Sequence, residues 1–397
     1  MTERAPTKAE PTKILHVFRA PLGGLFRHVC DLAAEQKRAG YKVGIICGEV
    51  PFDHVAAKKL DELAHHCELG IHVLPMGRLP GVGDVFNLLR VGALVRRLKA
   101  DVVHGHGAKG GAYVRLLPRF VGGIRIYTPH GGSLHFDARS FAGFVFLSLE
   151  KLMRLHTDAY IFESEFGLQA FTKKVGDPSA FFSVIHNGVA ATEFEPVNEA
   201  PDLADFVFVG ELRELKGIGT LIDAATLAGH PLHLRIVGSG AERERFESQA
   251  ASVPSCVRIE FLGSMPAREA FALGRNVVVP SYNESLPYIV LEAAAAGKPV
   301  IATRVGGMSE IFGPDASSLI DARDVGALAD RLRYAINHPV EMTALASRLR
   351  NRVQTEFTST QMTESVNALY QRLLAAKRAI SDDCDDRTSA SVEQVPL

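Results

Sequence analysis

Glu284-Ser-Leu-Pro-Tyr-Ile-Val-Leu-Glu292 is the stretch that decides the fold, because two acidic residues flank what should be the start of a helix. Pro287 suits the first helical position, so the backbone at Ser285, Leu286 and Pro287 would face outward, where a helix N-terminus attracts anions. A carboxylate beside a phosphate site repels phosphate, and it is better suited to accept hydroxyl groups such as those of a sugar. Together these features indicate a sugar nucleotide as ligand.

The same stretch resembles the paired-glutamate signature of the retaining glycosyltransferases of family 4, which have the two-domain GT-B fold. Seven residues separate the two glutamates, as in that family. Further stretches share the resemblance, and their order and spacing make it specific. They are Gly23-Gly24, Tyr127–Gly131, Ile185–Val189, Phe208–Gly217 and Gly297–Glu310, which fall within roughly residues 13–375.

Short β-like runs alternate with helical periods along the whole chain, as is typical of parallel sheets with helical crossovers. We predict strands at 14–18, 43–47, 72–74, 102–104, 124–128, 159–162 and 183–185, and then at 206–209, 234–237, 258–261, 277–279 and 300–302. The expected fold class is α/β, with two doubly wound, Rossmann-like domains. Since ligands bind beyond the carboxyl ends of parallel strands, we expect the substrate cleft between the domains.

The chain divides accordingly. Residues 1–12 are expected to be flexible, residues 13–195 to form the acceptor-side domain, and residues 206–356 to bind the nucleotide sugar. The segment 196–205 interrupts both periodicities and is interpreted as a linker. The resemblance implies that a helix at 357–379 crosses back to the first domain. From 380 to 397 the composition is polar and small, which predicts disorder.

The composition is that of a globular protein, with 22% charged and 47% hydrophobic residues. The sequence contains no run of the ~20 apolar residues that span a bilayer, and its polar N-terminus argues against a secretory signal peptide. The five cysteines show neither metal-ligand spacing nor a disulfide framework. We expect a cytoplasmic protein, and nothing indicates a nucleic-acid partner.

The net charge of −1 conceals an asymmetry between the two halves. Residues 1–195 hold 24 Lys+Arg and 19 Asp+Glu, or +5, and the remainder holds 44 − 24 = 20 and 45 − 19 = 26, or −6. Basic and apolar residues interleave from Leu88 to Lys99, which predicts an amphipathic helix. Its surface could meet anionic lipid at the inner face of a membrane, or a lipid-linked acceptor. The alternative is an ordinary solvated helix that packs by its Leu/Val stripe.

Arg213 and Lys216 follow the strand predicted at 206–209, and Gly210 begins the loop that carries them. A pair of loop cations can hold a diphosphate and stabilise it as it leaves, because negative charge grows on its oxygens. The resemblance assigns them this role, without a bound metal. Glu211 departs from the family pattern, which often has arginine after this glycine.

Gly23-Gly24 follows the first predicted strand and precedes a helix. Glycines there allow close approach of a ligand, and the helix start offers amides to phosphate, although a plain turn fits too. The resemblance assigns this loop to the donor phosphate and the acceptor. His130 ends another predicted strand, where its imidazole could bond a sugar hydroxyl. The matching family histidine lies close to the anomeric centre of the donor sugar.

His104 and His106 alternate across a strand end, a pattern that can be mistaken for metal ligands. Since no third ligand is evident in the sequence, we expect no metal there, and assign both histidines to the acceptor side.

The resemblance implies a metal-independent, retaining glycosyltransferase that needs no cofactor. It would move a sugar from a nucleoside diphosphate sugar to a hydroxyl acceptor, such as a lipid-linked or cell-surface polysaccharide precursor. Glu284 would hold sugar hydroxyls and Glu292 the ribose. The alternatives are a nucleotide-sugar epimerase or a glycoside phosphorylase on the same fold, and a silent nucleotide-sugar-binding protein.

Overall fold

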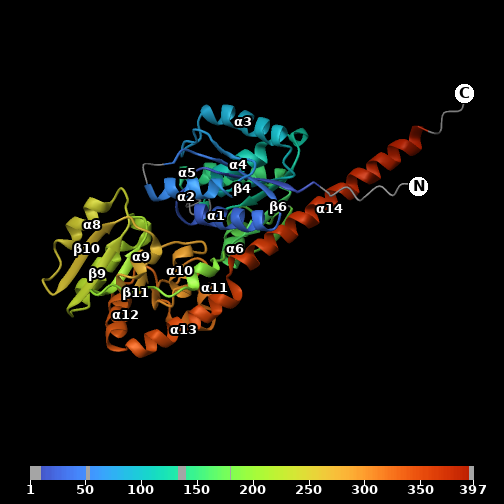
Figure 1. Ribbon diagram of the computed structural model, residues 1–397. Coiled ribbons are helices and arrows are strands. Elements are labelled where there is room, and N and C mark those ends of the chain that lie inside the picture. Colours follow the sequence, from blue (N-terminus) through green and yellow to red (C-terminus); the bar gives the residue numbers. More distant parts are fainter. Residues whose placement is uncertain (1–9, 51–53, 133–139, 179, 393–397) are drawn as a thin grey trace, which may run out of the picture.

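The computed structural model of the protein describes residues 10–50, 54–132, 140–178 and 180–392. Its described strands form two parallel sheets, each with helices on both faces (Figure 1). The seven-stranded sheet has the order β3-β2-β1-β4-β5-β6-β7, and the five-stranded sheet has the order β10-β9-β8-β11-β12. In both, the strand order reverses beside the first strand of the domain, which identifies two doubly wound domains. The predicted fold class is confirmed.

The first domain contains all seven strands that the sequence predicts, with ends displaced by at most two residues. They are β1 (Lys13–Phe18), β2 (Lys42–Cys47), β3 (Ile71–Val73), β4 (Val102–His106), β5 (Ile124–Thr128), β6 (Ala159–Phe162) and β7 (Phe181–Val184). The helices are α1 (Gly23–Arg38), α2 (His54–Ala64), α3 (Gly83–Leu98), α4 (Gly107–Leu116), α5 (Phe141–Met153) and α6 (Glu165–Lys174).

Strand β1 shows how the first sheet is covered. Because successive side chains of a strand point to opposite faces, Ile14 and Leu15 belong to different cores. Ile14 packs in a cluster with Leu32 of α1, whereas Leu15 packs in one with Val91 of α3 and Val114 of α4. Both faces of the sheet are therefore apolar at β1, which explains why this strand is a nearly continuous hydrophobic run in the sequence.

The second domain repeats this plan with five strands, all predicted. They are β8 (Ala204–Val209), β9 (Leu232–Val237), β10 (Val257–Gly263), β11 (Gly274–Val279) and β12 (Val300–Ala302). The helices are α7 (Ile218–Leu227), α8 (Arg243–Ala250), α9 (Ala267–Phe271), α10 (Tyr288–Ala295), α11 (Met308–Phe312), α12 (Val325–Asn337) and α13 (Pro339–Glu356). Since β8 begins at Ala204, the last two residues of the predicted linker belong to a strand.

Short 3-10 helices supplement these elements. They are η1 (Arg119–Val121), η3 (Arg154–His156), η4 (Ala191–Phe194), η5 (Glu214–Lys216) and η6 (Gly313–Ser318).

The chain passes between the domains twice, and the two crossings are joined. The Val189 amide donates to the Phe357 carbonyl at 2.9 Å, and the Ser359 amide donates to the Val189 carbonyl at 2.9 Å. After the second crossing, α14 (Ser359–Val392) lies on the first domain, where Val366 and Tyr370 share a core with Ile14. The terminal helix thus belongs to both halves of the molecule.

Helix α14 is longer than the sequence predicts. Disorder was expected from residue 380, but the helix continues to Val392 and projects from the molecule (Figure 1). The physical reason is that residues 359–392 contain neither glycine nor proline, so nothing interrupts the helix despite the polar composition. Residues 1–9 and 393–397 lie outside the described part of the chain, so the expected flexibility there stays a prediction.

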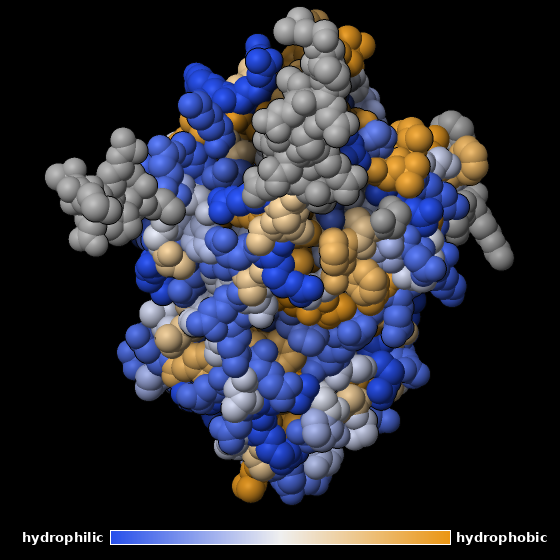
Figure 2. Space-filling model, turned by 90° about the vertical axis from the view of Figure 1, so that its right-hand side faces the viewer, coloured by the Kyte–Doolittle hydropathy of each residue, from blue (hydrophilic) through white to orange (hydrophobic). Residues whose placement is uncertain are grey.

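Hydrophobic residues are exposed on the side from which α14 emerges. Figure 2 shows that they gather in the middle of this face among hydrophilic ones. The edge strand β7 exposes Phe181 and Phe182, and Phe181 lines a cavity of about 360 Å³ with Leu369 and Leu373 of α14. Across the described residues, no helix combines the length and apolar character needed to cross a membrane.

Candidate active site

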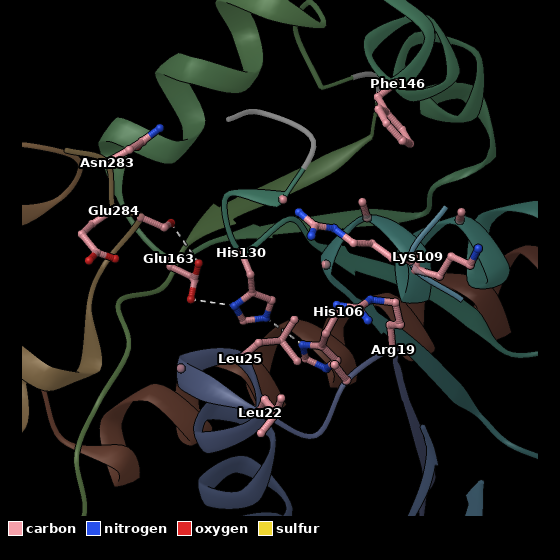
Figure 3. Close-up of a pocket in the computed structure, with 18 of the residues that line it drawn as sticks. Arg19, Leu22, Leu25, His106, Lys109, His130, Phe146, Glu163, Asn283 and Glu284 are labelled. Carbon is pink, nitrogen blue, oxygen red and sulfur yellow. Dashed lines mark hydrogen bonds and ion pairs between the residues drawn. The ribbon is translucent and has the colours of Figure 1, made fainter. Parts of the chain in front are cut away.

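A cavity of about 710 Å³ lies between the domains, at the carboxyl ends of both sheets (Figure 3). Eight of the predicted site residues line it, and they come from both domains. They are Gly24, His106, His130, Arg213, Glu284, Ser285, Leu286 and Pro287. The other five predicted site residues do not line the cavity. They are Gly23, His104, Gly210, Lys216 and Glu292. The predicted interdomain cleft therefore exists, and the fold brings most of its expected residues together.

The start of α10 forms the wall contributed by the second domain. Pro287 is the N-cap rather than the first helical residue, and the helix begins at Tyr288. The Glu284 carboxylate accepts from Ser281 Oγ at 2.7 Å and pairs with Lys216 Nζ at 2.6 Å. Lys216 thus pairs with a residue of the cavity wall without lining the cavity itself.

The loop before α10 depends on a glycine in the following turn. Gly306 has a φ of 58°, and an added Cβ would lie 2.1 Å from the Glu284 carbonyl oxygen. Its neighbour Gly307 donates its amide to the Ser285 carbonyl at 2.6 Å. The two turns can therefore approach each other only because residue 306 lacks a side chain.

Arg213 follows β8 and faces the cavity with a side chain that is 41% exposed. Its Nε lies 3.2 Å from Glu211 Oε2, so the residue that departs from the family pattern is a partner of this cation. Gly210 donates its amide to the Val237 carbonyl at 3.0 Å and serves the packing of the loop. An anion that reaches Arg213 would compete with Glu211.

Helices α1 and α10 face each other across the cleft. Gly23 has a φ of 66° and begins α1, and the Cα of Gly24 is close enough that an added Cβ would lie 3.5 Å from Tyr288. The left-handed conformation at Gly23 explains the need for glycine there. The first turns of both helices can thus approach one ligand from two sides.

Glu292 lies one turn deeper in α10 and is engaged by the opposite domain. Arg27 of α1 binds it through Nη1 at 3.2 Å, and also contacts Glu193 and Asp31 at 2.7 Å each. Burial raises the pKa of Glu292, and the charge of Arg27 acts against that increase. The ion pair between Arg27 and Glu292 connects α1 to α10 beside the cavity.

His130 has an unusual backbone, with a φ of 50° for a residue with a side chain. Such strain is kept where the surroundings fix it, often at functional sites. Its Nδ1 donates to Glu163 Oε1 at 2.7 Å, and its Nε2 lies 3.0 Å from His106 Nδ1. Both ring nitrogens are therefore occupied, and the expected hydrogen bond from this ring to a sugar hydroxyl would require one of these bonds to break.

The two histidines of the 104–106 motif differ in their surroundings. His106 lines the cavity, whereas His104 is fully buried between Tyr370 and Thr128, at 2.6 and 2.8 Å. His106 thus borders the cavity while only 1% exposed, so its role toward an acceptor stays a prediction, and His104 links α14 to the sheet.

The sequence offers no third ligand beside His104 and His106, whereas the fold brings further histidines to them, and the expectation that no metal binds there stays a prediction. Ring nitrogens of His16, His104 and His106, and likewise of His28, His106 and His130, lie within 4.8 Å of one another, close enough to hold a metal ion. The neighbouring strands β1 and β4 carry His16, His104 and His106, His130 follows the next strand β5, and His28 comes from α1. All of their ring nitrogens except His28 Nε2 take part in hydrogen bonds within the protein.

Sequence reasoning missed Glu163, which lines the cavity and follows β6 directly. It also missed Asn187, which donates to Glu163 Oε1 at 2.9 Å and to the Leu286 carbonyl at 2.8 Å. The available signal was their place, since both follow predicted strands at the edge where ligands bind.

Two family profiles match adjacent halves of the chain. The profile described as "Glycosyltransferase Family 4" matches residues 22–193, and "Glycosyl transferases group 1" matches residues 190–356. Among curated proteins, the chain is similar to a glycogen synthase of Mycobacterium tuberculosis, with 25% identity over 395 residues, covering 90% of this chain and 92% of the relative.

Solved structures show the same fold. Sucrose-phosphate synthase from Thermosynechococcus elongatus superposes with a TM-score of 0.77 and 23% identity, covering 92% of this chain and all of that one. Anabaena HepE, solved with UDP and glucose, superposes with a TM-score of 0.75 and 18% identity, covering 91% and 100%. The matched profiles, the paired glutamates and the two doubly wound domains show that the chain belongs to glycosyltransferase family 4, with the GT-B fold.

Proposed function

We propose that the protein transfers a sugar, with retention of configuration, from a nucleoside diphosphate sugar to a hydroxyl of a lipid-linked acceptor. The main observation in support is that residues of both domains line one cavity. The second domain contributes Arg213 and the residues before α10, and the first contributes Gly24 and His130. Cations and helix starts suit a diphosphate, and the Glu284 carboxylate suits sugar hydroxyls.

In this proposal the acceptor attacks on the face from which the diphosphate leaves, through an oxocarbenium-like state. The leaving phosphate takes the proton of the acceptor hydroxyl, while Arg213 and the start of α10 stabilise the growing negative charge. Glu284 holds hydroxyls of the donor sugar. Glu292 binds the ribose, for which its contact with Arg27 has to give way.

A lipid-linked acceptor is supported by the apolar surface beside the cavity. Leu79 precedes α3 and lines the cavity, and Val85, Phe86 and Leu89 of α3 are each at least 60% exposed. On α5, Phe144 and Leu152 are 65% and 64% exposed, and Phe146 and Leu149 line the cavity. Large exposed apolar patches mark interaction sites, and here the patch borders the place of the reaction.

The test is to incubate the purified protein with several nucleotide sugars. UDP-glucose comes first, because the structurally similar HepE was solved with UDP and glucose. Release of nucleoside diphosphate, with a new glycoside on an added lipid-linked acceptor, is the expected result. Proton NMR of the product gives the anomeric configuration. Interconversion of the sugar would instead identify an epimerase, and binding without turnover a silent binding protein.

We further propose that the transfer needs no bound metal, because Arg213 and the start of α10 can supply the positive charge that a metal gives elsewhere. Activity is expected to persist in excess chelator. Complete loss that returns with added manganese or magnesium would contradict this.

A further inference from the structure

His130 is the histidine that the sequence predicts to lie near the donor sugar. Both nitrogens of its ring already take part in hydrogen bonds within the protein, so neither is open to a substrate. One nitrogen donates to Glu163 Oε1 at 2.7 Å and the other bonds His106 at 3.0 Å. The acidic partner is better placed, since Glu163 lines the cavity and its Oε2 accepts from Ser285 Oγ at 3.0 Å (Figure 3). A carboxylate oxygen has room for more than one such bond.

Beyond Glu163, hydrogen bonds connect three imidazole rings in a row, which we call the file of histidines. His130 bonds His106, His106 Nε2 bonds His16 Nδ1 at 2.9 Å, and His16 Nε2 bonds Gln36 Oε1 at 2.9 Å. His16 and Gln36 are fully buried, His106 is 1% exposed, and the side chain of His130 is 5% exposed. Glu163 and the Gln36 oxygen, which close the file at its two ends, are both acceptors.

The number of N–H hydrogens that these hydrogen bonds need determines the charge of the three imidazole rings. Four bonds join three rings to two terminal acceptors, but three neutral imidazoles carry only three N–H groups. A fourth proton would complete the bonds and place one positive charge on the rings, which the Glu163 carboxylate would balance, although burial lowers the pKa of His16 and of His106 and so disfavours that charge on those two rings. If Gln36 turned its amide, its NH₂ group would supply the fourth hydrogen. In either arrangement, His130 donates from Nδ1 to an ionised Glu163.

We propose that Glu163 is a further catalytic residue, whose carboxylate stabilises the positive charge that develops on the donor sugar, and that the three histidines position it and keep it ionised. The inference rests on the proposed transfer. In that step the bond from the anomeric carbon to the phosphate oxygen breaks, and its electron pair leaves with the phosphate. The acceptor oxygen bonds the carbon and its proton goes to the phosphate, so Glu163 neither gains nor loses a proton.

The surroundings of Glu163 favour the ionised form. Burial alone would raise the pKa of Glu163, but the charge and hydrogen bond of His130 bring it to about 2. The other groups of the described chain that face Glu163 are His28 from α1, Tyr288 from α10, and the uncharged Asn187 and Ser285. Because the pKa is depressed, the charge is present above that value and is lost only as the pH falls toward it.

The experiment compares Glu163→Gln with Glu165→Gln, the same change two residues later at an exposed position outside the cavity lining. The wild type is assayed first, because its failure to turn over any nucleotide sugar would refute the proposed function itself. In Glu163→Gln, kcat should fall about a hundredfold, while calorimetric Kd for the donor changes less than about threefold. Glu165→Gln should match the wild type. A Glu163→Gln enzyme with kcat near that of the wild type would overturn the proposal.

Two further variants keep the proposal testable if glutamine disturbs folding. Glu163→Ala leaves space, so added formate should restore activity by returning a carboxylate, and no rescue at any formate concentration would count against it. His16→Leu, at the far end of the file, should weaken the hold on His130 and raise the pKa of Glu163. Its kcat should therefore decline with falling pH at a higher pH than in the wild type, and identical pH profiles would refute the positioning role.

Discussion

Arg213 and Lys216 are the two cations that we predict to bind the donor, but their surroundings differ. The Lys216 ammonium is 2.6 Å from the buried Glu284 carboxylate, whereas Arg213 is partly exposed beside Glu211. Removing Lys216 therefore leaves a buried carboxylate without its counter-ion, which is more costly than losing an exposed pair. The two residues should separate catalysis from stability.

We predict that Arg213→Ala lowers kcat/KM by about one to two orders of magnitude with no change in Tm, because a charged hydrogen bond contributes about 1.5–3 kcal/mol. Lys216→Ala should lower kcat/KM similarly and also reduce Tm. Steady-state kinetics and thermal unfolding measure both, with the exposed Arg245→Ala as control. Unchanged kinetics for Arg213→Ala would remove it from the site.

The two glutamates should divide the donor between them. Glu292→Gln is expected to weaken binding of the nucleoside diphosphate itself, because the ribose is present in both ligands. Glu284→Gln should spare the nucleoside diphosphate and weaken only the full donor. Calorimetry with both ligands measures this, and equal losses for both ligands in both variants would refute the division.

At this scale the sequence predicted the polar residues that follow strands within recognisable motifs, such as Arg213 and Glu284. It could not predict the partners that the fold brings from elsewhere. Arg27 reaches Glu292 over 265 positions, and His16 reaches His106 over 90. Such contacts depend on the order of strands in a sheet and on how the two domains meet, which no local spacing encodes.

Gly306 links two loops at the scale of elements. We predict that Gly306→Ala displaces the loop before α10, because its Cβ would lie 2.1 Å from the Glu284 carbonyl. Donor affinity should fall about tenfold or more in calorimetry. Gly229→Ala is the matched control, since its φ of 66° carries the same backbone strain, while the nearest atom to its added Cβ is 3.8 Å away. Equal donor binding in both variants would contradict the role of Gly306.

All twelve strands were predictable, because buried parallel strands are short apolar runs such as β11 and β12 between turn residues. Boundaries were less certain. The polar composition after residue 380 predicts disorder, but α14 continues to Val392 because no glycine or proline interrupts residues 359–392. The start of α10 differed by one residue, since proline fits either side of a helix boundary.

At the scale of the whole molecule, the excess of basic residues in the first domain is only partly a surface feature. Arg115 is fully buried against Glu150, and Lys109 pairs with Asp84. Arg96, Arg97 and Lys99 are exposed on and after α3, where they could reach an anionic bilayer. The exposed basic surface is thus smaller than the number of basic residues in the sequence suggests.

We predict that the protein sediments with anionic vesicles at low salt, with about 1 kcal/mol per basic residue near the surface, and less so as salt screens the charges. Charge reversal at Arg96, Arg97 and Lys99 should abolish sedimentation while donor hydrolysis continues. Serine at Val85, Phe86 and Leu89 tests the apolar contribution separately. If the wild type does not bind such vesicles, a soluble acceptor becomes the better proposal.

The joined crossings between the domains have a mechanical consequence. Val189 is hydrogen-bonded to Phe357 and Ser359, so the outgoing and returning chains meet at one place. Two connections that meet at one place can act as a single hinge, about which the domains could rotate. Opening would therefore separate Arg27 from Glu292 and Asn187 from Leu286 in one movement. A nucleotide could leave as soon as that swing releases it, which would make hinge opening a natural candidate for the slow step of turnover.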